Sequence, residues 1–474
     1  MNSNSYVKLT KEKPLLLALA FALTISVMNA TMFNVALPQI SAEFGLSPSQ
    51  ASWMQTPYMI VFAIGSVTYG KLADKFKLKD LLTFGLIGFA LGSLAGMAAN
   101  EFWIVVLGRV LQATGASAIT AASVIIPVRY FPRETRGRAL GVTATGIALG
   151  TAIGPSVAGF ITSAASWRLL FLLSLLALIA LPLFRSCLDD AKGTAKPTDL
   201  WGGLLLGGTL AAWLGALTGG GPLLAVAGCV LFGLFGIRIR CTREPFIRPS
   251  LLFGNKRFAF SLLVAFASSC AFFSTPFLVP LLLGNVNGLA PRHIGLTMLP
   301  AAAMAAFLGR LGGKIADRRG SAALYGGAAA LLASGFVLLS WAAGSSPALI
   351  AGVLVLANVG QTFMQIALSN TVSGTLPGDQ TGVGMGLFSM VGFISGAVST
   401  AALGRALDVG AHGVKLNPLH GGGPGLVYSD LFLALAVLVA LAAILYALLA
   451  ASGRKQTISK NRQHSPSYDK NTLD

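Results

Sequence analysis

The chain has 474 residues, of which 54% are hydrophobic and only 11% are charged, and its mean hydropathy is +0.74. Soluble domains carry about 25% charged residues, so this composition excludes an ordinary soluble protein. Lysine and arginine outnumber aspartate and glutamate by 34 to 16, a formal net charge of +18 that would indicate nucleic acid binding only in a soluble chain. A spanning helix needs about 20 mostly apolar residues, and the chain has room for more than ten such helices.

The first apolar run begins at about Pro14 and continues to about Ile40, after a polar segment that carries Lys8, Lys11 and Lys13. This run is longer than the hydrophobic part of a cleaved signal peptide and lacks a convincing cleavage site, so it predicts a retained first helix. Because basic residues stay on the inner side of the membrane during insertion, the N-terminus is predicted to be cytoplasmic.

Glycine, proline and charged residues divide the remainder of the chain into further apolar runs. Six runs precede a basic loop at 185–199, two shorter glycine-rich runs come next, and six more complete the chain. The predicted spans lie at about 14–40, 53–73, 81–99, 102–128, 138–163, 167–184, 200–218, 222–237, 258–283, 293–313, 321–343, 348–373, 382–407 and 429–451.

These spans predict an all-α integral membrane protein with four parts. The expected parts are an N-terminal six-helix bundle at 1–184, a linker with two additional helices at 185–257, a C-terminal six-helix bundle at 258–451 and a basic cytoplasmic tail at 452–474. With fourteen spans both termini lie inside, and the inner segments then hold 29 of the 34 lysine and arginine residues. This asymmetry supports the topology. The topology places no acidic residue deep in the bilayer.

An internal repeat follows the second span of each bundle. The segment 71–74, which ends in Asp74, recurs as 314–317, which ends in Asp317. Such a repeat is expected of two homologous bundles that flank a site at the membrane midplane. An aspartate at an inner helix end can cap the next helix or pair with a cation, and so hold two helices together while the inner side is closed. A solvated loop acid is the alternative, but it explains two copies in register poorly.

These residues resemble the major facilitator superfamily, whose fold has two six-helix bundles. The segment 70–75 is similar to that family's loop motif, although Lys77 and Leu78 stand where glycine and arginine are usual; the second copy, 313–320, keeps the glycine. The six-two-six layout resembles the fourteen-helix drug:proton antiporter branch. The resemblance implies that the bundles rock about a central site and that Asp74 and Asp317 latch the inner gate.

Arg109, with Gln112 and Gly115, is similar to the family's fourth-helix motif, with Ala113 in place of a usual glycine. An arginine in lipid is costly, so this side chain is expected to face the bundle interior and bind backbone carbonyls, a polar side chain or a transient carboxylate. The alternative is an arginine that extends from a helix end to the interface. The resemblance implies a part in proton transfer.

The fifth predicted helix resembles an exporter motif built of glycines and one proline: Gly141, Gly150, Gly154, Pro155 and Gly159. Small residues four apart let two helix backbones approach closely, and proline bends the helix by removing a backbone donor. The motif therefore predicts a tight, kinked contact where the two bundles can seal, with generic helix packing as the alternative. The resemblance implies export rather than uptake.

The intramembrane acids common in tetracycline and multidrug exporters are absent at the matching positions. Asn29-Ala30, Thr151 and Ser395 stand there instead. Tetracycline specificity and the usual proton site are therefore not supported. Coupling is expected to use Asp74, or Glu101 or Asp408 near the outer helix ends.

Polar side chains in mid-membrane are expected to line water or to bind one another. Asn358, Gln361 and Gln365 lie at i, i+3 and i+7, hence on one helix face. We expect this face to line the substrate cavity together with Asn29, Asn34 and Gln55. Hydrogen bonding that merely holds the bundle together is the alternative.

The sequence thus predicts a transporter rather than an enzyme. We expect a monomer in the lipid bilayer of a bacterial plasma membrane that exports small amphipathic drugs or antibiotics by proton antiport. The proton-motive force would drive it, without a cofactor, a metal or a nucleic acid partner. A facilitator or uptake carrier for a metabolite, without antiport, is the first alternative. A sensor or membrane enzyme is the second, but the chain lacks a sizeable soluble domain and a cluster of His, Cys or carboxylate residues.

Overall fold

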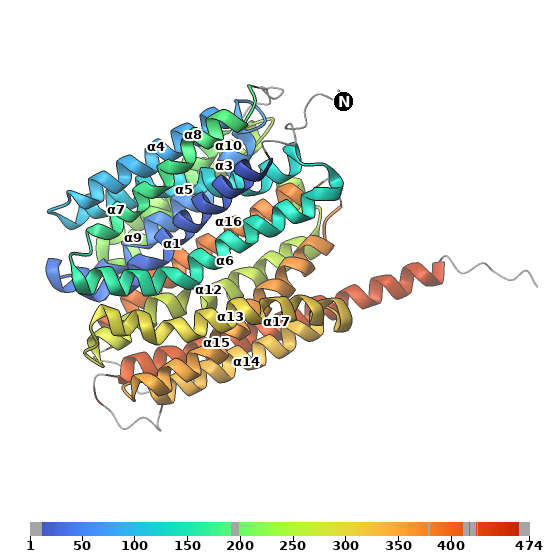
Figure 1. Ribbon diagram of the computed structural model, residues 1–474. Helices are drawn as coiled ribbons and strands as arrows, with labels where there is room; N and C mark the ends of the chain where they lie inside the picture. The colour runs from blue at the N-terminus through green and yellow to red at the C-terminus, as the bar shows by residue number, and fades with distance from the viewer. Residues whose placement is uncertain are drawn as a thin grey trace, which may run out of the picture.

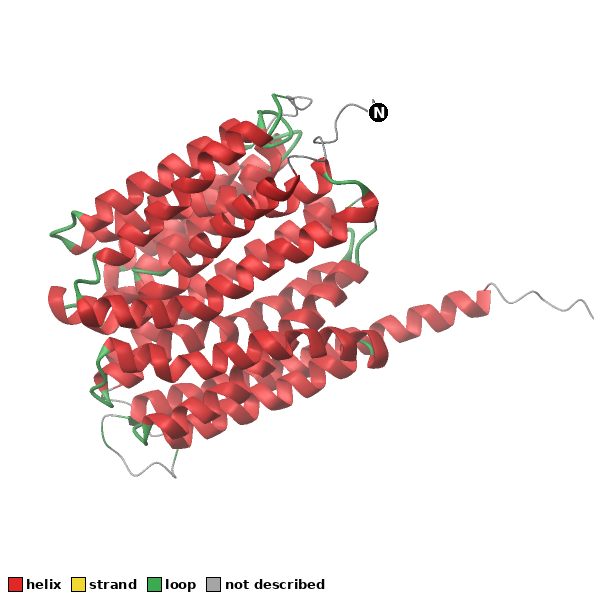
Figure 2. Ribbon diagram, viewed as in Figure 1, coloured by secondary structure: helices red, strands yellow, loops and turns green. Residues whose placement is uncertain are grey.

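The computed structural model describes residues 12–190, 199–377, 380–410 and 425–463, together with Asn417 and Gly423. Within these ranges the chain consists of helices and short connections and contains no strand (Figure 2). The fold class predicted from the sequence is therefore confirmed.

The first group of helices corresponds to the first six predicted spans. Its elements are α1 (Glu12–Phe44), α2 (Pro48–Ser52), α3 (Thr56–Leu72), α4 (Leu78–Met97), α5 (Phe102–Tyr130), α6 (Arg133–Ala164), α7 (Leu169–Ser174), η2 (Leu175–Ile179) and α8 (Ala180–Cys187). The sixth predicted span is one run of helix, α7 to α8, that tightens to a 3₁₀ turn at η2. We call α1 to α8 the first bundle.

The other helices follow in chain order. They are α9 (Leu200–Gly215), the π turn η3 (Ala216–Gly220), α10 (Pro222–Cys241), α11 (Pro249–Phe253), α12 (Lys256–Asn285), α13 (Pro291–Arg319), α14 (Ser321–Ala342), α15 (Pro347–Gly374), α16 (Thr381–Val409) and α17 (Leu426–Gln463). We call α12 to α17 the second bundle. Gly219 and Gly221 have positive φ angles of 103° and 85°, which glycine adopts without steric cost, and this permits the tight reversal from α9 into α10.

Thirteen helices of the described chain are long and apolar enough to span a membrane. The second predicted span corresponds to α3, which has 17 residues and is shorter than each of those thirteen helices. A helix of about 17 residues is still at the lower end of the range that crosses a bilayer. The protein is therefore a multi-pass membrane protein, and each of the fourteen predicted spans coincides with a helix of the structure.

The two bundles lie side by side, and α9 packs against both α10 and α3 (Figure 1). Across the bundles, α6 contacts α13, and α16 contacts both α2 and α3. We call the end at which α1 begins and α3 ends the basic end, because its connections carry most of the described lysines and arginines; the other is the opposite end. The last helix, α17, continues well past the other helices at the basic end (Figure 1).

An ion-pair cluster ties the first bundle together at the basic end. Asp190, just after α8, lies 2.6 Å from Nζ of Lys77, in the connection between α3 and α4, and 2.7 Å from Nζ of Lys79, in the first turn of α4. Hydrogen bonds from the two ammonium groups lower the pKa of Asp190 to about 2. The carboxylate is thus ionised at physiological pH and links the two connections.

Candidate transport site

The guanidinium of Arg109 lies in a fully buried cage of oxygen atoms between α1, α3 and α5. Its Nη1 donates to Asn29 Oδ1 at 2.7 Å and to Gln112 Oε1 at 3.1 Å. Its Nη2 donates to Gln55 Oε1 at 3.4 Å, and its Nε donates to the carbonyl oxygen of Met54 at 3.4 Å. The side chain therefore faces the bundle interior rather than the interface.

Two aromatic rings complete the cage. The guanidinium carbon lies 4.1 Å from the ring centre of Tyr58 and 4.6 Å from that of Phe33, within the range of a cation–π interaction. Among the described residues no carboxylate binds Arg109. The cation is thus held by neutral acceptors and aromatic faces alone, as a desolvated charge requires when no counterion is present.

A second layer of hydrogen bonds orients the amides of the cage. Asn29 Nδ2 donates to Ser174 Oγ on α7, Gln55 Nε2 donates to Asn34 Oδ1, and Gln112 Nε2 donates to Ser93 Oγ on α4. Each amide oxygen thus points at the guanidinium or at a neighbouring amide donor. Three residues proposed from the sequence for the cavity, Asn29, Asn34 and Gln55, are therefore buried members of the Arg109 network.

The polar face of α15 divides between packing and exposure. Gln361 is buried, and its Nε2 donates to Thr275 Oγ1 on α12 at 2.7 Å and to the carbonyl oxygen of Ala271 at 3.3 Å. Asn358 is half-buried and Gln365 is exposed. Gln361 thus connects two helices of the second bundle, whereas the side chains of Asn358 and Gln365 are not enclosed by packing.

At the opposite end, α6 and α13 touch backbone to backbone across the two bundles. A Cβ added at Gly159 would lie 2.6 Å from the carbonyl oxygen of Pro291, and one added at Gly295 would lie 2.5 Å from that of Pro155. The backbone N–H of Arg292 donates to Ser163 Oγ at 2.9 Å. No side chain larger than hydrogen fits at the two glycine positions, so this contact depends on them.

A second contact at the same end joins α16 to the short helix α2. The carboxylate of Asp408 accepts hydrogen bonds from Ser47 Oγ and from the backbone N–H of Ser49, each at 3.3 Å. A Cβ added at Gly404 would lie 2.8 Å from the carbonyl oxygen of Pro48. The sequence analysis did not predict α2, although Ser47-Pro48-Ser49-Gln50 has the residues of a capping box with proline at the first helical position.

The glycine motif of α6 is shared between two different interfaces. A Cβ added at Gly150 would lie 2.6 Å from the carbonyl oxygen of Thr24, and one added at Gly154 would meet Thr31 Oγ1. Both positions face α1 within the first bundle. Only the part of the motif formed by Pro155 and Gly159 faces the second bundle.

At the basic end, the positions compared on α3, α6, α13 and α16 show no such close contact. A Cβ added at Gly70 on α3, Gly141 on α6, Gly313 on α13 or Gly386 on α16 would meet no atom within 4 Å. The side chains of α6 from 144 to 151 and of α13 from 303 to 311 include many exposed residues. The bundles are therefore closed at the opposite end and separated at the basic end.

Asp74 and Asp317 lie at this separated end. Asp74 Oδ1 is 3.4 Å from Arg129 Nη2, and Arg129 also donates to the carbonyl oxygen of Ala73, so these contacts stay within the first bundle. Asp317 is exposed and forms no ion pair with a described residue. In this conformation neither aspartate connects the two bundles.

Residues 19–400 match the model of the Major Facilitator Superfamily, which covers most of the chain. The chain belongs to this superfamily. It is therefore a secondary transporter rather than an enzyme, from a family whose members generally need no cofactor and typically function as monomers.

Named relatives of this transporter include a riboflavin transporter and an efflux pump. It is 24% identical over 396 residues to the riboflavin transporter RibZ of Clostridioides difficile, covering 81% of this chain and 86% of the relative. It is 32% identical over 326 residues to the efflux pump dotC of Dothistroma septosporum, covering 63% and 55%. A bacterial homologue of the human lysosomal transporter Spinster, solved in an inward-facing and unoccupied conformation, has a similar fold with a TM-score of 0.69, 17% identity and coverage of 94% and 98%.

In this transporter an aromatic contact joins the Arg109 network to the second bundle. The ring of Tyr58 is 6.0 Å from that of Phe62, which lies 4.3 Å from the ring of Phe393 on α16. The ring of Phe393 is in turn 5.6 Å from that of Phe273 on α12. Tyr58 also faces Arg109. A movement of α16 against α3 therefore changes the packing of Phe62, which stacks on Tyr58 beside the buried cation.

Proposed function

We propose that this transporter exports small amphipathic compounds, including drugs or antibiotics, across a bacterial plasma membrane in exchange for protons. The observation that carries the proposal is that the two ends of the bundle interface differ. Backbones of α6 and α13 touch at the opposite end, whereas a Cβ added at Gly141 or Gly313, at the basic end, would meet no atom within 4 Å. The positive-inside rule assigns the basic end to the cytoplasm. The space between the bundles then opens toward the cytoplasm, the side from which an exporter takes its substrate.

In the proposed transport cycle, the contacts between the bundles at the opposite end open while new contacts form at the basic end. When the bundles rock, the glycine contacts of Gly159 and Gly295 separate, and the basic ends of α6 and α13 approach each other. Smooth backbone contacts separate without pulling apart interlocked side chains. We propose that Asp74 and Asp317 then hold the inner gate closed, each from its own bundle.

Three carboxylates remain candidates for the link to protons: Asp74, Glu101 and Asp408. Of these, Asp408 accepts hydrogen bonds from the other bundle, Asp74 binds within its own bundle, and Glu101 is exposed at the start of α5. Protonation of Asp408 removes negative charge from an acceptor of two hydrogen bonds and weakens the closure of the opposite end. We propose that external protons favour opening of this end through Asp408, and that Arg109 tunes the group that carries the proton.

Asp408→Asn is expected to reduce the dependence of transport on external pH. The amide keeps the shape of the carboxylate but has no charge that changes with pH. Substrate efflux from cells or right-side-out vesicles, measured at external pH values between 5 and 8, checks this. Glu101→Gln is the matched control, because Glu101 is exposed at the same end of the bundle and forms no ion pair with a described residue. A wild-type pH profile in Asp408→Asn would contradict the proposed role.

Proteoliposomes test export coupled to protons. Vesicles with an acidic lumen are expected to accumulate a transported dye or drug, since protons leaving the vesicle drive substrate entry. The compounds to use come from a drug-susceptibility panel in an efflux-deficient bacterium, with Gly154→Leu as the inactive control. Equal accumulation with and without the gradient would remove the antiport proposal.

A facilitator or uptake carrier for a metabolite is the second candidate. The observation that favours it is the neutral cage of Arg109, in which no described carboxylate takes part. A relative named as a riboflavin transporter makes riboflavin a suitable first probe. Gradient-independent exchange of labelled riboflavin, together with no change for any drug in the panel, would establish this candidate in place of drug export.

A further inference from the structure

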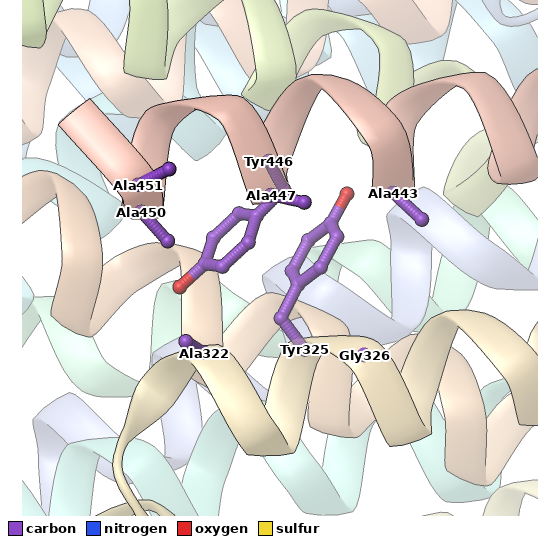
Figure 3. Close-up of a pocket in the computed structure, with 8 residues that line it drawn as sticks. All are labelled: Ala322, Tyr325, Gly326, Ala443, Tyr446, Ala447, Ala450 and Ala451. Carbon is purple, nitrogen blue, oxygen red and sulfur yellow. The ribbon is translucent and has the colours of Figure 1, made fainter.

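A groove of about 380 Å³ lies between α14 and α17 near the basic end, and its lining residues come from these two helices alone. Figure 3 shows these residues. Its walls are six small residues and its floor is two tyrosines: Ala322, Tyr325, Gly326, Ala443, Tyr446, Ala447, Ala450 and Ala451. Ligand pockets commonly have volumes of about 300–1,000 Å³, so this groove lies at the lower end of that range.

The two tyrosines at the floor of the groove are held by ring stacking and by hydrogen bonds. The rings of Tyr325 and Tyr446 stack at 3.8 Å with an angle of 7° between their planes. The hydroxyl of Tyr325 is 2.7 Å from Ser268 Oγ, and that of Tyr446 is 2.6 Å from Thr371 Oγ1. Both hydroxyls are engaged with neighbouring helices, and the stacked rings of Tyr325 and Tyr446 are only 1% and 4% exposed, so they close the floor of the groove while the alanine methyl groups line its walls.

The surroundings of the groove differ along its length. On α17 the neighbouring side chains of Leu441 and Ile444 are 53% and 58% exposed, as expected of a helix that faces lipid. At the basic end, the last turns of α13 contain three basic residues and one acid: Lys314, Asp317, Arg318 and Arg319. Ala322, the first residue of the groove, follows shortly after them in α14. These four residues carry a net charge of +2, so an apolar groove ends at a positively charged turn.

We infer that the groove binds one anionic phospholipid, with an acyl chain between the small residues of its walls, above the tyrosine floor, and the headgroup at Arg318 and Arg319. Basic pockets beside membrane helices bind anionic headgroups, and anionic lipids are abundant in the cytoplasmic leaflet. The small residues at 443, 447 and 451 are spaced by four, a pattern that also suits a helix of a second copy. A symmetric pair at this groove would bring two positively charged turns together, and the charge therefore favours the lipid.

Native mass spectrometry of the full-length chain in detergent tests the inference. The purified protein is titrated with palmitoyl-oleoyl phosphatidylglycerol and, separately, with the phosphatidylcholine of the same chains. We expect the anionic lipid to be retained with higher occupancy. Each of Arg318→Gln and Arg319→Gln is expected to reduce its affinity roughly fivefold, the effect of one basic residue near a charged headgroup.

Gly326→Leu fills the groove and is expected to abolish the preference for phosphatidylglycerol. Gly327→Leu is the matched control, because neither glycine has an atom within 4 Å of an added Cβ and only Gly326 lines the groove. Ala447→Leu repeats the test from α17, should Gly326→Leu not fold. Unchanged retention in both groove variants, or a dimer that Gly326→Leu converts to a monomer, would overturn the inference. The test does not depend on which substrate is transported.

Discussion

Arg109→Ala is expected to abolish transport in proteoliposomes and to lower the melting temperature of the purified protein. The substitution leaves the oxygens of Asn29, Gln112 and Gln55 without their donor in a space closed to water. Each buried polar group left unpaired costs about 1–3 kcal/mol. It also removes the cation that Tyr58 and Phe33 enclose, so α1, α3 and α5 lose the residue that connects them.

Arg109→Lys separates the charge from the geometry. Lysine keeps the positive charge but lacks the planar fork that reaches acceptors on α1, α3 and α5 together. We expect a melting temperature between those of the wild type and Arg109→Ala, with transport still strongly reduced. Transport at the wild-type rate in Arg109→Ala would show that the buried cation has no part in the cycle.

Gly150→Leu is expected to inactivate the transporter by forcing α6 away from α1. Even its Cβ would lie 2.6 Å from the carbonyl oxygen of Thr24 and 3.0 Å from the backbone nitrogen of Met28, and backbone atoms cannot move aside as a side chain can. Overpacking costs about 1–3 kcal/mol in ordinary cores, and we expect a value at or above that range here. Because Pro155 and Gly159 on the same helix seal the opposite end, its displacement also disturbs the bundle contact. Thermal unfolding and dye accumulation measure the two effects.

Gly141→Leu is the matched control for stability. It belongs to the same glycine motif and the same helix, but an added Cβ there meets no atom within 4 Å. We expect a melting temperature equal to that of the wild type. Equal destabilisation by the two substitutions would mean that leucine harms α6 at any glycine, and not through contact with α1.

The positions of the spans were predictable because the bilayer imposes a requirement on sequence. A helix that crosses lipid must be apolar over about 20 residues, and glycine, proline and charge mark where it ends. The run from Pro14 to Ile40 and the basic loop after the sixth span therefore located helices correctly. Some ends differ, since α1 extends to Phe44 and α17 continues about three turns past residue 451, to Gln463.

The partners of the site residues were not predictable in the same way. The amides of Asn29 and Gln55 were expected at the cavity but bind Arg109, and only tertiary packing brings three helices to one guanidinium. Gly150 and Gly159 look alike in the sequence, yet one faces α1 and the other faces α13. A helix face is readable from spacing, whereas the neighbour on that face is not.

The sequence by itself determined the membrane class, the number of spans, the repeat and the buried arginine, because each follows from local composition or from a motif within one helix. The tertiary structure decided which end of the molecule is closed, that Asp408 reaches Ser49 across the bundles, and that two tyrosines on α14 and α17 stack beneath a groove. These features join residues far apart along the chain. Apolar periodicity carries no information about such distances, and only the packing of whole helices against one another sets them.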